Sequence, residues 1–274
     1  MVARPTKAAL AYYPFILLFI VVSILISFPL VPMLVSSSAI PPYELPERIS
    51  FTKLFRLSPM GLTGSFLNGI SQAALYVALV LYGNAVRLSS SAIGGLMGSL
   101  TIGGMLFQFP LGKLSDRFDR RLIIVCAPGL SIPLCLGLAM LNNPADNLLL
   151  LYLLVALLGG LTLPIYSICM AHINDHLKPS QVIAASGTLV LILASGMILG
   201  PSLGGFVIDH DGANGIFYLL SVTAGLTVMT APFRFWSGAA VRDEDRGKAV
   251  AVPSSLTPVA TVLYAPASDH GEIK

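Results

Sequence analysis

The stretch GKLSDRFDRR, residues 112–121, holds four basic and two acidic residues within ten positions. Apolar runs long enough to cross a bilayer lie on both sides of it. Of the 274 residues in the chain, 55% are hydrophobic and only 11% are charged. A soluble globular domain carries about 25% charged residues, so this chain has too little polar surface to cover its apolar residues in water. The sequence therefore predicts a membrane protein in which 112–121 is a turn between two spanning segments.

Seven segments are apolar and long enough to cross a bilayer, which takes about 20 residues of helix. We expect helices because every backbone polar group in lipid must be satisfied within its own segment. The predicted fold class is therefore all-α, with about seven transmembrane helices. The expected helices cover residues 12–35, 59–83, 91–111, 122–141, 148–173, 182–207 and 214–234.

The basic residues set the expected orientation, because cytoplasmic loops carry an excess of Lys and Arg. One set of connections and the carboxyl-terminal tail hold 13 basic residues, and the opposite set holds Arg4, Lys7 and Arg87. We therefore expect the amino terminus outside and the carboxyl terminus in the cytoplasm. The 13 are Arg48, Lys53, Arg56, Lys113, Arg117, Arg120, Arg121, Lys178, Arg234, Arg242, Arg246, Lys248 and Lys274.

Residues 112–121 combine glycine, aspartate and arginine in an order that a simple basic turn does not explain. Gly112 has no side chain, so a neighbouring helix can approach it closely. Asp116 can accept hydrogen bonds from a helix amino terminus, where the dipole favours an anion. Three arginines can pair with the aspartates or with anionic lipid headgroups, namely Arg117, Arg120 and Arg121.

This pattern resembles the loop signature of the major facilitator superfamily, G-x-L-[AS]-D-R-x-G-R-R. Asp119 stands where the family usually has glycine, and aspartate tolerates left-handed backbone conformations better than most residues. A second stretch, GMILGPSLGG at 196–205, resembles the antiporter signature of the same family, although it falls in the second half. Ordinary close packing of small residues is the alternative explanation for this stretch. Its residues are Gly196, Gly200, Pro201, Gly204 and Gly205.

The resemblance implies two six-helix halves joined by a cytoplasmic linker, with the charged turn after the second helix of a half. Residues 59–236 then form the carboxyl-terminal half, and 1–35 contain the last helix of a preceding half. Residues 36–58 are the linker, and 237–274 are a disordered cytoplasmic tail. The first five helices are expected to be missing, so the chain is either a truncated product or needs a partner that supplies them.

The resemblance also implies that the first and fourth helices of a half line a substrate cavity. Polar and aromatic residues recur at helical spacing on both of these segments. They could form a polar cavity wall, or they could serve only as hydrogen bonds between helices. The candidate substrate contacts are Asn68, Gln72, Tyr76, Tyr166 and Met170.

The expected function is secondary active transport of a small solute by alternating access, with efflux or antiport as its possible form. The expected location is a plasma membrane, the inner membrane of a bacterium. We expect no cofactor, no bound metal, no enzymatic activity and no nucleic-acid partner. A seven-helix receptor or sensor is the alternative. A membrane enzyme would rest only on HINDH (172–176), which we interpret as an interfacial helix end.

Overall fold

The computed structural model describes residues 7–28, 30–31, 47, 49–141 and 144–230. The chain divides into two compact units, residues 1–43 with 248–274 and residues 44–247, and each is considered by itself. The first unit contributes α1 (Lys7–Ser27), an apolar helix. The helix expected at 12–35 overlaps α1, and residues 29 and 32–35 lie outside the described part. Most of the predicted linker and all of the predicted tail at 237–274 also lie outside it.

The described part of the second unit is helical and contains no strand. Its main helices are close to the predicted spans, and a short helix occupies part of the predicted linker. The helices are α3 (Phe51–Leu57), α4 (Pro59–Ala85), α5 (Ser90–Arg117), α6 (Arg120–Ala139), the 3-10 turn η1 (Pro144–Asn147), α7 (Leu148–Thr162), α8 (Ile165–Asn174), α9 (Pro179–Asp211) and α10 (Gly215–Met229).

The predicted fold class is confirmed. In the described chain, five helices are long and apolar enough to cross a membrane, counting η1, α7 and α8 as one span. Two shorter apolar helices, Ile16–Ser27 and Gly215–Met229, complete the set of seven expected segments. The fourth span of the second unit is interrupted at Leu163 and Pro164, because proline has no N–H to continue the helical hydrogen bonds.

Polar residues between the apolar runs fix where several helices begin. Ser58 caps α4 by accepting from the Gly61 N–H, and Pro59 occupies the first helical position. Ser89 accepts from the Ala92 N–H at the start of α5, and Asn147 accepts from the Leu150 N–H at the start of α7. The helices therefore start at residues that satisfy their first free N–H groups.

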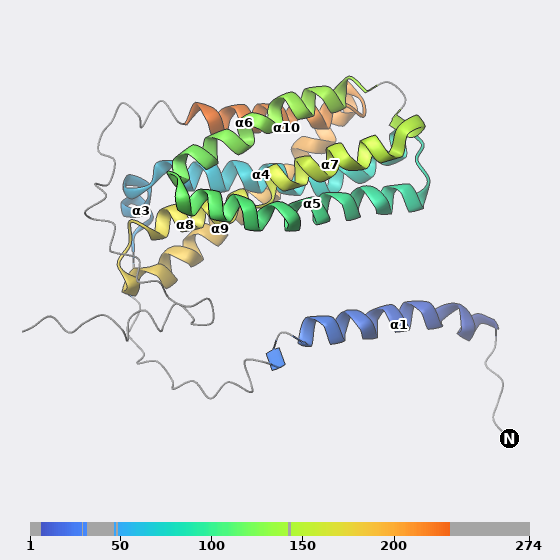
Figure 1. Cartoon of the computed structure of the whole chain (residues 1–274), viewed down its shortest axis with the longest axis horizontal. Helices are drawn as coiled ribbons and strands as arrows, with labels where there is room; N and C mark the ends of the chain where they lie inside the picture. The colour runs from blue at the N-terminus through green and yellow to red at the C-terminus, as the bar shows by residue number, and fades with distance from the viewer. Residues whose placement is uncertain (1–6, 29, 32–46, 48, 142–143, 231–274) are drawn as a thin grey trace, which may run out of the picture. The chain divides into compact units, whose positions relative to one another are not determined.

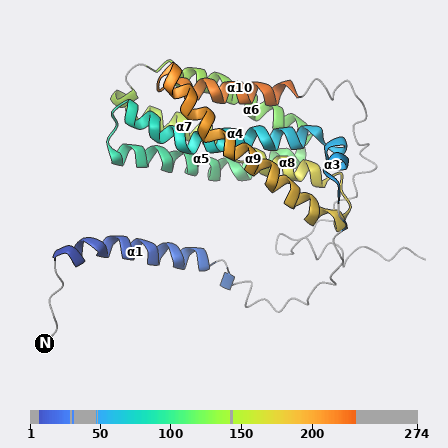
Figure 2. The same cartoon turned by 180° about the vertical axis from the view of Figure 1, so that it is seen from behind.

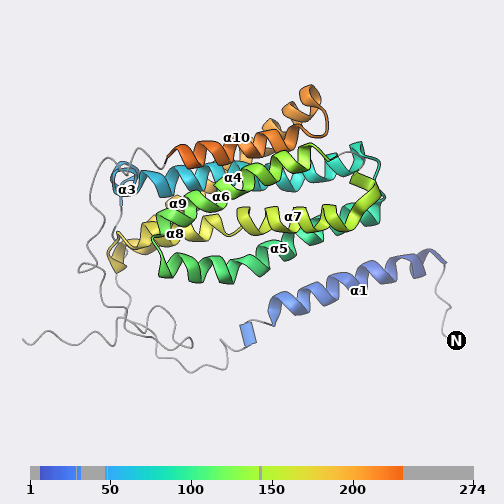
Figure 3. The same ribbon diagram turned by 45° about the horizontal axis from the view of Figure 1, so that its top comes forward.

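The helices of the second unit pack as a bundle in which α4 contacts α8, α9 and α10 (Figure 1). Viewed from behind, α9 crosses α4 obliquely, and α6 and α10 lie side by side (Figure 2). A third view shows α5 along α7, with α8 continuing beyond the break (Figure 3). The ends of α5 and α8 and the starts of α6 and α9 share one end of the bundle with α3.

Glycines allow α5 and α7 to approach at backbone distance. A Cβ atom added to Gly103 would overlap the backbone of Ala156, and one added to Gly159 would overlap the carbonyl of Leu100. Small residues allow such approach in lipid, where van der Waals packing replaces the hydrophobic drive between helices. Gly103 and Gly159 therefore serve the close packing of α5 against α7.

Candidate functional site

The turn within 112–121 is shorter than the sequence pattern suggests. Helix α5 continues to Arg117 and α6 begins at Arg120, so only Phe118 and Asp119 connect them. The apolar span predicted to end at residue 111 therefore continues as a charged helix end.

Asp119 does not use a left-handed conformation. Its φ of −63° and ψ of 123° are extended, and its side chain accepts from the Arg121 N–H at 3.0 Å. Asp119 is therefore the N-cap of α6, a position that aspartate favours. The structure assigns to Asp119 the interaction with a helix amino terminus that the sequence suggested for Asp116.

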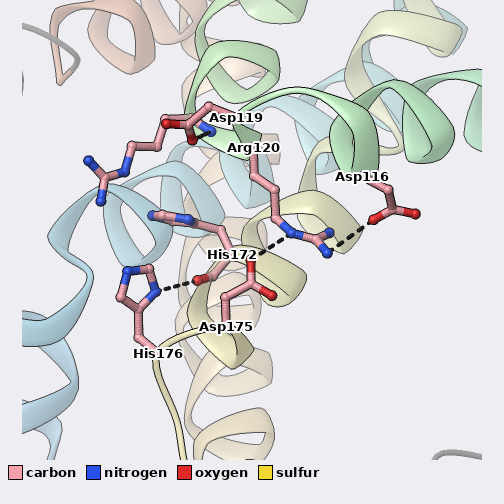
Figure 4. Close-up of polar contacts among 7 residues, drawn as sticks. Asp116, Asp119, Arg120, His172, Asp175 and His176 are labelled. Carbon is pink, nitrogen blue, oxygen red and sulfur yellow. Dashed lines mark hydrogen bonds and ion pairs between the residues drawn. The ribbon is translucent and has the colours of Figure 1, made fainter. Parts of the chain in front are cut away.

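Arg120 lies between two carboxylates (Figure 4). Its Nη2 is 3.0 Å from Asp116 Oδ1, and its Nε is 2.7 Å from Asp175 Oδ2. Asp116 belongs to the last turns of α5, and Asp175 follows the end of α8. Arg120, at the start of α6, therefore links the end of α5 to the end of α8. These two helices belong to the second and fourth spans of the bundle.

The face of α5 around Gly112 is open in the described bundle. A Cβ atom on Gly112 would meet nothing within 4 Å, so the close helix approach predicted there is not made within the described bundle. Lys113 instead holds its Nζ 4.8 Å from the centre of the Phe109 ring, and Arg117 is exposed. An open groove on α5 is lined by Met105, Gln108, Phe109, Gly112, Lys113 and Asp116.

Two of the candidate substrate contacts hydrogen-bond at the break in the fourth span. Asn68 Nδ2 donates to the Thr162 carbonyl at 2.8 Å. Gln72 Nε2 donates to Asn68 Oδ1 at 2.8 Å and to the Leu163 carbonyl at 3.4 Å. Because Pro164 interrupts the helix, these carbonyls lie where regular helical bonding stops, and amides from α4 reach them.

The other three candidates lie elsewhere. Tyr76 is 40% exposed on α4. Tyr166 and Met170 are half-buried on α8 and pack against a cluster formed by α3, α4, α8 and α9. The structure thus brings Asn68 and Gln72 together and leaves Tyr76 apart from Tyr166 and Met170.

The glycine stripe of α9 faces α4. A Cβ atom on Gly196 would overlap the Phe66 carbonyl, and one on Gly200 would lie 2.6 Å from the Ile70 carbonyl. A Cβ atom on Gly204 would be 3.6 Å from the Ala78 Cβ, whereas one on Gly205 would meet nothing within 4 Å. Pro201 lies within the helix, which continues past it to Asp211.

The HINDH stretch ends α8. His176 Nδ1 lies 2.8 Å from the His172 carbonyl, and the two rings meet edge to face with centroids 5.0 Å apart. Within the described chain, no three His, Cys, Asp or Glu residues gather in a way that could hold a metal. Asp175 of this stretch forms an ion pair with Arg120.

Two features of the site were missed by the sequence analysis. The pairing of Asp175 with Arg120 joins residues 55 positions apart, and the only signal was an acidic residue at the end of the fourth span. The break at Pro164 had a clearer signal, because this proline falls inside the predicted helix 148–173.

Sequence comparison with known proteins identifies the family of this chain. A model of the Major Facilitator Superfamily matches residues 61–267. A protein named "Uncharacterized MFS-type transporter YcaD" from Escherichia fergusonii is 28% identical over 180 residues, which are 65% of this chain and 45% of the relative. A similarly named protein of Enterobacter sp. is 30% identical over 169 residues, 62% of this chain and 42% of the relative.

The YcaD protein of Shigella flexneri is 27% identical over 177 residues, 64% of this chain and 44% of the relative. The chain thus spans less than half the length of the curated relatives it matches. No solved structure matches it. The family model covers most of the chain, including the charged turn and the glycine stripe, and the chain therefore belongs to the Major Facilitator Superfamily.

Proposed function

We propose that residues 59–236 form one six-helix half of a secondary active transporter, which moves a small solute by alternating access. The observation that carries this proposal is the family match over residues 61–267, which contain the helical bundle. Alternating access needs two such bundles that rock about a shared site. The second half would be carried by the same polypeptide or by a partner.

Two contacts support a half that moves as one body. The close approach of α9 to α4 at Gly196 and Gly200 joins the first and fifth helices of the half. Arg120 joins the second and fourth through Asp116 and Asp175. Such internal ties suit a rocking mechanism, because the bundle is tilted without being taken apart. The uncovered face of α5 around Gly112 is then available to the other half.

The proposal also includes the cavity residues, the membrane location and the direction of transport. The proposed cavity residues would contact the solute at the interface with the second half. They are Asn68, Gln72, Tyr76, Tyr166 and Met170. We propose a bacterial inner membrane location with the charged turn on the cytoplasmic side. The resemblance of 196–205 to the antiporter signature favours exchange or export. The similar proteins are named as transporters, which favours transport over a receptor.

Counterflow tests this function. The chain is joined to the first half of the Escherichia fergusonii relative, reconstituted in liposomes and screened with a panel of labelled solutes. We expect at least one labelled solute to enter faster when the same unlabelled solute is loaded inside the liposomes. An exchanger returns its binding site to the outside with unlabelled solute bound, and it can then bind labelled solute again. Saturable uptake without this acceleration would contradict exchange, and the absence of saturable uptake across the panel would contradict the transport proposal.

A further inference from the structure

A small cavity lies inside the bundle, among α4, α6, α7, α8 and α10. Its volume of about 20 Å³ is enough for one water-sized occupant. The described residues that line it are buried, and none of them carries an ionisable side chain. The polar members of the lining are Asn68, Ser71, Ser131, Thr162 and Thr227.

Asn68 offers this cavity a hydrogen-bond donor. A side-chain amide has two N–H groups and one oxygen. The Asn68 oxygen accepts from Gln72 Nε2, and one Asn68 N–H donates to the Thr162 carbonyl at 2.8 Å. The second N–H has no acceptor among the described residues. A buried N–H without an acceptor destabilises the fold, so the cavity favours an occupant that accepts a hydrogen bond.

Two hydroxyl groups at the cavity offer acceptors. Ser131 Oγ donates to the Pro128 carbonyl at 2.7 Å, and Thr227 Oγ1 donates to the Thr223 carbonyl at 2.9 Å. A hydroxyl has one proton to donate and two lone pairs that accept. Both oxygens therefore retain acceptor capacity, and an occupant that also donates hydrogen bonds can use it.

The cavity lies next to a direct polar contact between α4 and α10. The hydroxyl oxygens of Ser71 and Thr223 are 2.8 Å apart. Asn68 and Thr227 each lie about one helical turn from this contact, toward the end of the bundle where α4 begins and α10 ends. An occupant of the cavity would therefore continue the polar contact between these helices and extend it to Ser131 on α6.

We propose that this cavity is a binding site for one ordered water molecule, held by the Asn68 N–H and by the Ser131 and Thr227 oxygens. The water accepts from the amide and donates its two protons to the hydroxyl oxygens, which gives the three hydrogen bonds typical of a buried water. A bare cation cannot accept from the amide, and an apolar occupant would satisfy none of the three groups. The water joins α4, α6 and α10 independently of the proposed transport.

Radiolytic footprinting of the purified full chain in nanodiscs tests the proposal. Radiation converts water into hydroxyl radicals, which react with the nearest side chains before they can cross a packed protein interior. Mass spectrometry locates the label. We expect labelling at Leu158 and Leu220, which line the cavity and are 1% and 4% exposed. The matched controls are Leu79 and Ile123, which are 1% and 4% exposed but do not line it, and should stay at background.

Substitutions at the hydroxyl groups identify the water that produces the label. Thr227→Val and Ser131→Val each replace an acceptor by a methyl group, so each should abolish the labelling of Leu158 and Leu220. The control is Thr188→Val, whose hydroxyl also bonds to its own helix but does not line the cavity. It should leave the labelling unchanged.

Labelling is compared between lining and control positions within one sample, so differences in radiation dose cancel. The two cavity substitutions lie on different helices, so either can serve if the other fails to fold. Labelling of Leu158 and Leu220 no stronger than that of Leu79 and Ile123 would overturn the proposal, because the cavity would then be dry. Labelling that persists in both cavity variants would also overturn it, because the water would then bind elsewhere.

Discussion

The guanidinium of Arg120 holds two carboxylates on different helices, and both pairs are partly exposed. The Arg120 side chain is 25% exposed, against 68% for Asp116 and 49% for Asp175. Exposed ion pairs contribute only about 0.2–1 kcal/mol each to stability. Their value here is therefore positional, because they fix the end of α5 against the end of α8.

Arg120→Gln should lower the stability of the chain by about 1 kcal/mol, because both ion pairs are lost. The matched control is Arg121→Gln in the same turn, which removes a charge but leaves both pairs and the backbone cap at Asp119 in place. Thermal unfolding in detergent measures both. Equal effects of the two substitutions would show that only total charge matters.

Asn68 illustrates what a sequence can and cannot predict at a single residue. Its polar character and its position on the first helix of the bundle are readable from the sequence. Its partner is not, because the Thr162 carbonyl is 94 positions away and is reached only when α4 packs against the break in the fourth span. Residue type thus predicted a polar contact, and tertiary packing decided its partner.

At the scale of elements, hydropathy predicted the helices well because lipid allows few alternatives. The ends were predicted less well. Helix α9 runs from Pro179 to Asp211, beyond the expected 182–207, because polar residues at a membrane surface can continue a helix that hydropathy would end. The connection at 36–58 contains a short helix, α3, whose Leu54 is fully buried. That burial depends on contacts with other helices and has no local signal.

The glycine stripe gives an element-scale prediction. Gly196→Ala should destabilise the chain by about 1–3 kcal/mol, because the added methyl group would overlap the Phe66 carbonyl and force α9 away from α4. Gly205→Ala is the matched control, since its added methyl group would meet nothing within 4 Å. The measurement is the thermal unfolding midpoint of each variant in detergent. Similar midpoints for the two variants would contradict the close packing of α4 and α9.

At the scale of the whole bundle, every described Lys and Arg of the second unit except Arg87 lies at one end. This end contains Lys53 in α3, the basic residues on both sides of the turn at 118–119, and Lys178 before α9. Arg87 lies at the other end of the bundle, in the connection between α4 and α5. Arg48 and the basic residues of the tail, with Arg4, lie outside the described residues. The orientation inferred from the positive charges therefore corresponds to a physical separation of charge along the bundle.

Single cysteines report this orientation. In a background of Cys126→Ser, Cys135→Ser and Cys169→Ser, Arg87→Cys should react with a membrane-impermeant maleimide in intact cells. Phe118→Cys should react only after permeabilisation. Phe118 is suitable because it is 50% exposed, whereas Ser115 in the same region is buried. Labelling of Phe118→Cys from outside would reverse the assigned topology.

The central claim is that the described bundle transports only against a second half, and flux measured in liposomes tests it most directly. One preparation contains the purified chain alone, and the other contains the chain joined to the first half of a relative. The solute is one that the counterflow panel identifies. We predict saturable uptake in the second preparation and background leak in the first. Saturable uptake by the chain alone would contradict the claim.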